Sequence, residues 1–281
     1  MPEACSYTIL AGMISRLLEL LHYRELVANL VVRDLKVRYK NSVLGVLWSL
    51  VNPLAMMAVF TLVFTFMLPN NTTPNFPVFV LCGILPWNFF RDSLMGAIAS
   101  IVNNAPLIKK VYFPREVLPI SVILGNLVNF LLALIVLFVM ILAFRMPLTR
   151  WAWLLPVVIV TQVFFTAGLG LILSTANVFY RDTAMIMEVL ILAWFFLTPV
   201  FYPIEVLPQQ KMLLGLTLDV RRLVYILNPM ASLIATYRVI LYNGAPPAWD
   251  FFLRTVATSV IILVVGYWFF LRYRQTFAEE V

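Results

Sequence analysis

The stretch VLPISVILGNLVNFLLALIVLFVMILAF, residues 117–144, carries no charged side chain. A helix needs about 20 apolar residues to cross the roughly 30 Å hydrocarbon core of a bilayer, so this stretch predicts a membrane-spanning helix. Comparable apolar runs lie on both sides of it. We expect six spans in total, at about 44–68, 78–102, 117–144, 152–178, 185–202 and 252–271.

The composition of the 281-residue chain supports this reading. It is 63% hydrophobic and 12% charged, whereas a soluble domain has about a quarter of its residues charged. So few polar residues could not cover a soluble globule, and the low charge also argues against a disordered chain. The sequence therefore predicts an all-α polytopic membrane protein. The net charge of +7 is then read as loop Lys and Arg that set orientation, and no nucleic-acid partner is expected.

Three regions are expected along the chain. Residues 1–42 are basic and amphipathic, and predict helices lying at the membrane surface that break near His22–Glu25. Residues 43–272 form the transmembrane domain, and residues 273–281 form a short tail. The basic side chains of the first region could also bind lipid phosphates; they are Arg33, Lys36, Arg38 and Lys40.

Lys and Arg are more numerous in the segments that a cytoplasmic N-terminus places inside. The positive-inside rule and the even number of spans therefore predict that both termini are cytoplasmic. The long connection at 203–250 looks helical over 206–218 and 223–242, with a break at Asn228-Pro229. We expect two short re-entrant or interfacial helices near the outer face, with an ordinary extracellular helical hairpin as the alternative.

The sequence argues against an enzyme. The phosphate-binding pattern G-x-x-x-x-G-K-[ST] is absent, so the chain is not expected to bind ATP by that motif. The acidic residues are scattered, and His22 is the single histidine, which makes a metal site or a His-based triad improbable. No cofactor or metal is expected in this chain.

Two kinds of side chain in the spans are candidates for a translocation path. Arg91 and Asp92 lie deep in the second span, where a charge is costly and is usually kept for function. As neighbours in sequence they are expected to point apart and not to pair. Their alternative role is a structural contact with another helix. Aromatic rings could guide sugar rings, or could simply face lipid; these are Trp87, Phe89, Phe90, Phe195, Phe196 and Tyr202.

The loop NNAPLIKKVYFPRE, residues 103–116, reads as a short amphipathic helix displayed in the cytoplasm. We expect it to dock to a partner protein, with exposed aromatic anchors and basic side chains that orient the complex. The alternative is a topological anchor. The candidate docking residues are Lys109, Lys110, Tyr112, Phe113, Arg115 and Glu116.

Five segments in combination and order resemble one family, the membrane subunits of polysaccharide-exporting ABC transporters. These are the type-2 export permeases of O-antigen, capsule and teichoic-acid systems. The segments are RDLKVRYKNSVLGVLWSLVNPL (33–54), GILPWNFF (83–90), NNAPLIKKVYFPREVLP (103–119), LTPVFYPIEVLP (197–208) and NPMASLIATYRVILYNG (228–244).

The resemblance implies a homodimer of this chain bound to two copies of a separate ATPase subunit, which would bind ATP and Mg. Such a complex moves a polysaccharide linked to undecaprenyl diphosphate across the bacterial plasma (inner) membrane. In that family, residues 103–116 would match the coupling region, and the aromatics around 87–90 and 195–202 would match the channel-lining zones. Two other readings stay open, namely a same-fold exporter of a lipid or drug and a membrane enzyme acting on lipid-linked sugars.

Overall fold

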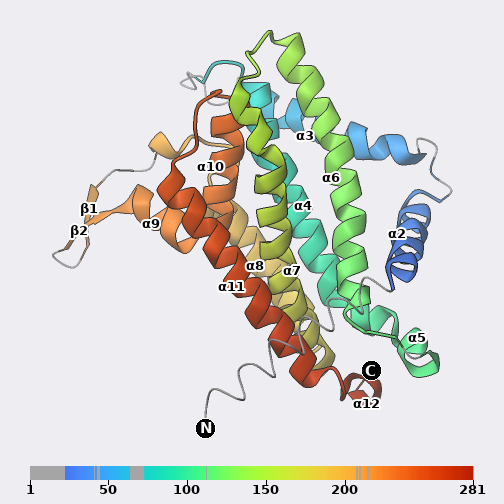
Figure 1. Cartoon of the computed structure of the whole chain (residues 1–281). Helices are drawn as coiled ribbons and strands as arrows, with labels where there is room; N and C mark the ends of the chain where they lie inside the picture. Colours follow the sequence, from blue (N-terminus) through green and yellow to red (C-terminus); the bar gives the residue numbers. More distant parts are fainter. Residues whose placement is uncertain are drawn as a thin grey trace.

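Apart from one small hairpin, the described part of the chain is helical in the computed structural model (Figure 1). The structure describes residues 23–40, 42, 45–63, 73–111, 113–206, 208, 210–213 and 216–280.

Four long helices confirm four of the expected spans. They are α4 (Phe76–Asn103), α6 (Val117–Ala143), α7 (Leu155–Phe179, preceded by the 3₁₀ helix η3, Arg150–Leu154) and α11 (Trp249–Tyr273). Each is long and apolar enough to cross a membrane, because 20 residues at 1.5 Å rise already span about 30 Å. Figure 1 shows α4, α6 and α7 standing side by side, with α11 crossing α7 obliquely.

The contact between α7 and α11 is the most extensive in the described chain. It depends on Gly168 and Gly266, which face each other at the crossing. A Cβ atom on either glycine would collide with the backbone of the opposite helix. Small residues of this kind let membrane helices approach closely, and the packing of the two backbones then stabilises the pair.

The other two expected spans are short. Helix α3 (Trp48–Leu62, after the 3₁₀ helix η1, Gly45–Leu47) and helix α8 (Thr183–Leu197) have 15 residues each. For α8 that length gives about 22 Å, less than the hydrocarbon core, whereas the described residues at the end of α3 stop at Val63. Helix α8 ends just before Pro199, which has no N–H to continue the helix. With four spanning helices, or up to five if one bent pair counts as a span, the expectation of six is not confirmed.

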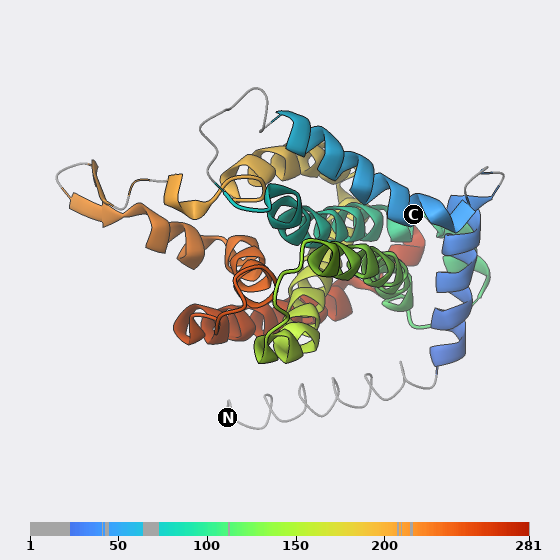
Figure 2. The ribbon, with the colours of Figure 1, turned by 90° about the horizontal axis from the view of Figure 1, so that it is seen from above.

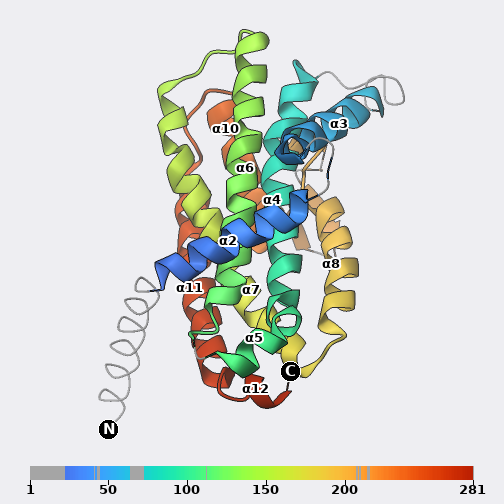
Figure 3. The same ribbon diagram turned by 90° about the vertical axis from the view of Figure 1, so that its right-hand side faces the viewer.

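Helix α2 (Arg24–Tyr39) lies across the bundle, roughly perpendicular to α6 (Figure 3). It contacts α6, and its Leu30 is buried while its charged side chains face outward. This is the geometry expected of an interfacial helix. The other predicted interfacial helix, before His22, lies outside the described residues.

The prediction of a helix at 206–218 is wrong. After the 3₁₀ helix η4 (Ile204–Val206), β1 (Gln210–Leu213) pairs antiparallel with β2 (Leu216–Asp219), with Gln210 opposite Asp219. Seen from above, this hairpin projects from one side of the bundle (Figure 2). Alternating Leu and Thr after Gly215 is a strand pattern, and it outweighs the helical spacing of the leucines.

The second part of the connection is helical, as predicted, and it breaks at Asn228-Pro229. Helices α9 (Val220–Leu227) and α10 (Pro229–Leu241) meet at an angle of 105°. Asp219 caps α9 by accepting from the backbone N–H of Arg222, and Asn228 caps α10 by accepting from that of Ala231.

The connections divide between the two ends of the bundle. Helix α5 (Ala105–Lys110) and helix α12 (Phe277–Glu280) lie at the same end in Figures 1 and 3. The α6–α7 and α10–α11 connections meet at the opposite end, where a Cβ on Gly244 would collide with the side chain of Thr149. The loop at 103–116 and the C-terminal segment, which the charge count placed on one side of the membrane, therefore share one end of the molecule.

Candidate functional site

A polar pocket opens between α3, α4 and α6. Its polar side chains repeat at helical spacing on each helix, so one face of each helix contributes to it. This pattern places carboxamides, a hydroxyl and a carboxylate inside an otherwise apolar bundle. The polar lining residues are Ser49 and Asn52 on α3, Asn88 and Asp92 on α4, Asn126 and Asn129 on α6, and Arg38 near the end of α2.

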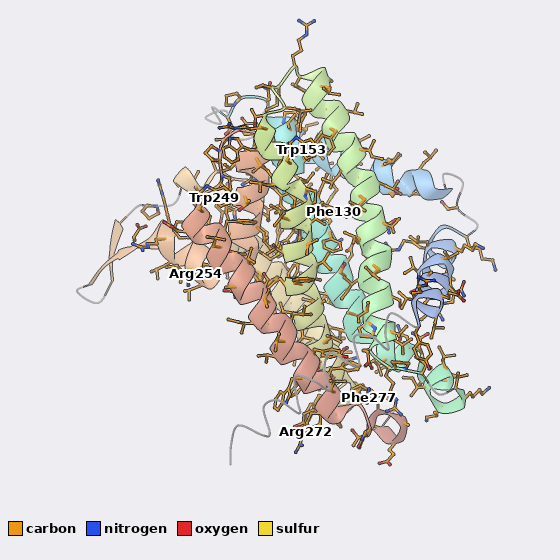
Figure 4. All side chains as sticks on the ribbon, in the orientation of Figure 1. Phe130, Trp153, Trp249, Arg254, Arg272 and Phe277 are labelled. Atoms are coloured by element: carbon orange, nitrogen blue, oxygen red, sulfur yellow. The ribbon has the colours of Figure 1, made fainter. Side chains whose placement is uncertain are left out.

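The pocket has a volume of about 250 Å³ and is partly open. Its apolar wall includes Phe89 and Phe130, whose rings stack with centroids 5.2 Å apart. Trp48 is half exposed on the opposite side of the opening. Figure 4 shows Phe130 on α6, where that helix faces the interior of the bundle.

This lining suits a ligand rich in hydroxyl groups. An asparagine both donates and accepts hydrogen bonds, and an ionised aspartate accepts them, so the set can pair with hydroxyls in several orientations. The aromatic side chains supply flat apolar faces beside these polar groups. Polar residues at membrane depth are usually functional, and helical spacing of Asn88 with Asp92 and of Asn126 with Asn129 could have revealed the pocket from the sequence.

The expectation that Arg91 and Asp92 do not pair is wrong. Arg91 Nε donates to Asp92 Oδ1 at 2.9 Å, and Nη2 lies 2.8 Å from the same oxygen. The two Cβ atoms point apart, but the long arginine side chain curls around the helix to its neighbour. Both side chains are about two-fifths exposed, and Asp92 alone of the two lines the pocket.

The predicted path-lining aromatics of the second and fifth spans come together. Trp87 contacts Phe195, with ring centroids 5.4 Å apart, and Phe195 contacts Phe201 at 5.5 Å. Trp87, Phe89 and Phe90 are all buried, and of the three only Phe89 lines the polar pocket.

At the rim of this aromatic cluster, Phe196 is 57% exposed and Tyr202 is partly exposed. The Tyr202 hydroxyl donates to the carbonyl of Phe196 at 3.1 Å. Phe60 of α3 stacks on Phe201, with centroids 6.0 Å apart, so the cluster joins α3 to the end of α8.

Arg238 is a buried charge that the sequence reasoning counted only as a loop residue. Its guanidinium donates to the carbonyls of Pro199, at 2.5 Å, and Val200 in the turn after α8. The sequence gave a signal for this buried site, because Arg238 follows Ile234 by four residues in the apolar sequence of α10, and an arginine in such a helix needs a polar partner. Here the partners are backbone carbonyls.

The loop at 103–116 is largely packed against the bundle. The exposed residues of the described loop are Asn103, Pro106, Lys109, Lys110 and Val111, which is 53% exposed. The prediction that Phe113 is exposed is wrong, because its side chain is only 6% exposed. Phe113 is buried because residues from other parts of the chain pack against it, including residues of α2 and of the C-terminal segment.

The remaining predicted docking residues differ in environment. Glu116 is 1% exposed and lies 3.5 Å from the Arg274 guanidinium, whereas Arg115 is partly buried. Tyr112 lies outside the described residues.

The basic residues of the first region are exposed on α2 and just after it. Arg33 pairs with its neighbour Asp34 at 2.9 Å. Arg38 also reaches the polar pocket, which places a basic group beside the hydroxyl-binding set. The exposed basic residues are Arg33, Lys36, Arg38 and Lys40.

The described residues contain no cluster of three or more His, Cys, Asp or Glu side chains that could hold a metal ion.

Comparison with known proteins shows which family the chain matches. A family model described as ABC-2 type transporter matches residues 25–242. The O-antigen export system permease protein of Myxococcus xanthus is 39% identical over 269 residues, which are 96% of this chain and 100% of that relative. A permease protein with the same description from Klebsiella pneumoniae is 33% identical over 256 residues, 91% of this chain and 94% of the relative. More distantly, the polysialic acid transport protein of Escherichia coli is 21% identical over 199 residues, 66% of this chain and 72% of the relative.

Proposed function

Because the chain belongs to the ABC-2 type transporter family, we propose that it is the membrane subunit of an ATP-driven polysaccharide exporter in the bacterial inner membrane. Its relatives are described as permease proteins of O-antigen export systems and as a polysialic acid transport protein. The chain is a permease subunit and not itself an enzyme. ATP hydrolysis belongs to a separate ATPase subunit.

The observation that carries the proposal is the extent of the likeness to O-antigen permeases. It covers 96% of this chain, so it includes the polar pocket, the aromatic cluster and the loop at 103–116 together. The pocket supports a glycan substrate, because a drug or simple lipid would not use so many hydrogen-bonding groups at membrane depth.

In the proposed mechanism, the polar pocket holds hydroxyl groups of the glycan. Asp92 and the asparagines of α4 and α6 accept and donate hydrogen bonds, and Trp48 offers a flat face at the opening. Each hydrogen bond can pass from one sugar hydroxyl to the next, so a polymer can advance through the pocket. The exposed rings of Phe196 and Tyr202 extend the path toward the end of α8.

The assembly and the carrier are further parts of the proposal. Two copies of this chain, each with residues 43–272 as its transmembrane domain, would bind two copies of the ATPase, which would hold ATP and Mg. The exposed basic residues at 33–40 would attract the diphosphate of an undecaprenyl-diphosphate-linked polysaccharide and the phosphates of membrane lipids. Both termini would be cytoplasmic, and α9 with α10 would form a re-entrant pair. The glycan could be of the O-antigen, capsule or teichoic-acid type.

The test is complementation of a bacterium that lacks its own O-antigen permease, with the cognate ATPase co-expressed. A hydrogen bond to a charged group contributes about 1.5–3 kcal/mol, so Asp92→Asn is expected to lower surface polysaccharide about tenfold or more. Val128→Ala is the matched control, because Val128 is 39% exposed on α6 near Asn126. Export at wild-type rate by Asp92→Asn would contradict the role of the pocket. Absence of surface polysaccharide with the wild-type pair would contradict the function.

A further inference from the structure

We propose that the C-terminal segment, residues 274–280, is a coupling element that locks the 103–116 loop to α11, so that movement of the loop is transmitted to the far side of the bundle. The inference rests on the proposed function, because it assigns a route to the energy that the ATPase supplies. We call residues 274–280 the tail.

The first support is a reciprocal pair of polar contacts between neighbouring residues. Arg115 Nη1 donates to the backbone carbonyl of Arg274 and lies 3.4 Å from that of Gln275. Arg274 returns the contact, with its Nη1 3.5 Å from Glu116 Oε1. Arg115 of the loop thus binds the backbone of the tail, and Arg274 of the tail places a positive charge beside Glu116 of the loop.

The second support is the burial of Glu116. Its side chain is 1% exposed, and neither carboxylate oxygen has a hydrogen bond within the described residues. A buried carboxylate needs a counter-charge, and the Arg274 guanidinium, which is 18% exposed, is the one that the described residues provide. Glu116 immediately precedes α6, so the pair fixes the start of that helix relative to the tail.

The third support is apolar. Phe277 of α12 is fully buried, and its ring lies 5.2 Å from that of Phe270 on α11 and 6.4 Å from that of Phe179 at the end of α7. It belongs to one buried cluster with Phe113 of the loop and Leu30 of α2. Figure 4 places Phe277 at the same end as Arg272, below the bundle.

These contacts place the tail between the 103–116 loop and the end of α11. The exposed residues of the described loop lie on α5 and beside it, so force from the ATPase would enter at α5; they are Asn103, Pro106, Lys109, Lys110 and Val111. Helices α4 and α6 flank α5 directly in the chain, but α11 does not. The tail is the direct continuation of α11, and α12 contacts both α5 and α7.

Close packing makes this connection stiff, because packed interiors have discrete arrangements and do not deform continuously. A displacement of α5 therefore moves the tail, and the tail moves the end of α11. Helix α11 carries the displacement to α7 through the Gly168–Gly266 crossing. In this way a displacement at one docking surface is transmitted to helices from both halves of the sequence.

The experiment uses the complete permease–ATPase complex in proteoliposomes. The variants are Arg274→Gln, Phe277→Leu and the double variant Glu116→Gln with Arg274→Gln. The control is Glu279→Gln with Glu280→Gln, two exposed residues on the same short helix. Four quantities are measured, namely assembled complex by pull-down, the ATPase rate, export, and nucleotide-dependent hydrogen exchange of residues 249–273.

We expect Arg274→Gln and Phe277→Leu to assemble and to hydrolyse ATP near the wild-type rate. Export per ATP is expected to fall about fivefold or more, the lower range of usual coupling between sites. ATP binding should no longer change hydrogen exchange in α11. The double variant, which leaves no unpaired charge, should assemble at least as well as Arg274→Gln and still be uncoupled, and the control should match wild type.

Two results would overturn the inference. One is export that falls only in proportion to assembled complex, with export per ATP unchanged, since this is what a merely structural role predicts. The other is an unaltered exchange response of α11 in Phe277→Leu. Failure of the proposed function would look different, because wild-type complex would export no polysaccharide while the exchange response would still report on the tail.

Discussion

The guanidinium carbon of Arg238 on α10 lies 3.7 Å from the centre of the Phe79 ring on α4. Together with the carbonyls after α8, the face of this ring places partial negative charge against the buried guanidinium. The planar guanidinium fits this arrangement, because its donors spread in one plane toward several acceptors. The residue thereby joins α4, α8 and α10.

We predict that Arg238→Lys destabilises the protomer, although the charge is kept. A lysine cannot donate to Pro199 and Val200 in the same fork, and each buried acceptor left without a donor costs about 1–3 kcal/mol. The measurement is thermal unfolding in detergent. The control is Arg254→Lys, since Arg254 is exposed and has one weaker bond, at 3.3 Å, to the carbonyl of Ile226. Equal unfolding temperatures for the two variants would show that the forked hydrogen bonds of Arg238 to Pro199 and Val200 do not stabilise the protomer.

Gly83→Ala should be among the most damaging small changes in α4. A Cβ at this position would collide with the Val200 carbonyl and the Arg238 side chain. Gly125→Ala is a matched control, because a Cβ on Gly125 meets nothing within 4 Å and a helical glycine costs about 1 kcal/mol relative to alanine. Gly125→Ala should therefore be neutral or stabilising. A folded yield for Gly83→Ala equal to that of Gly125→Ala would show that the close approach is not required.

Truncating Phe113 should act on stability, whereas truncating Lys109 and Lys110 should act on partner binding. Phe113 is 6% exposed in a buried cluster, and removing a core Phe costs about 3–5 kcal/mol. The two lysines are exposed and leave the fold intact when replaced by alanine. Unfolding temperature and pull-down of the ATPase, measured on each variant, separate the effects. Normal stability of Phe113→Ala would contradict its burial.

Arg91→Ala is expected to lower export more than it lowers stability. Arg91 is about two-fifths exposed and pairs with Asp92, so its removal breaks a partly solvated ion pair of small structural value. It also leaves the pocket carboxylate without its neighbouring charge. Export is measured per assembled complex. If the variant is unstable and export per complex is unchanged, Arg91 has only a structural role.

The orientation of the chain can be tested by single-cysteine labelling in a background without Cys5 and Cys82. Lys110→Cys should react only after the membrane is opened, because the loop at 103–116 is expected inside. Trp153→Cys should react from outside intact cells, since Trp153 is 87% exposed at the opposite end of the bundle (Figure 4). Labelling of position 110 from outside would reverse the topology.

The sequence predicted what depends on long apolar runs. Helices α4, α6, α7 and α11 match the expected spans because an uninterrupted run leaves no other way to satisfy the backbone in a membrane. The break at Asn228-Pro229 was also visible, because proline ends a hydrogen-bonded ladder. Length failed as a guide for α8, whose apolar run continues past Leu197, where the helix ends.

Two features that the sequence did not predict arise from contacts between distant segments. Phe113 was expected to be exposed, and its burial depends on the tail, which comes much later in the chain. The polar pocket needs three helices to be aligned before its asparagines meet. The pairing of Arg91 with Asp92 is different, because it is local and depends on side-chain flexibility, which Cβ directions alone do not describe.

The crossing of Gly168 and Gly266 has a consequence for how the protein is made. Helix α7 leaves the ribosome long before α11, so during synthesis the glycine surface of α7 has no partner. The most extensive contact of the bundle therefore forms last, after the final helix has entered the membrane. Until then the nascent chain holds an incomplete bundle. A chain that stops before residue 266 would keep that surface open, and membrane quality control could recognise it there.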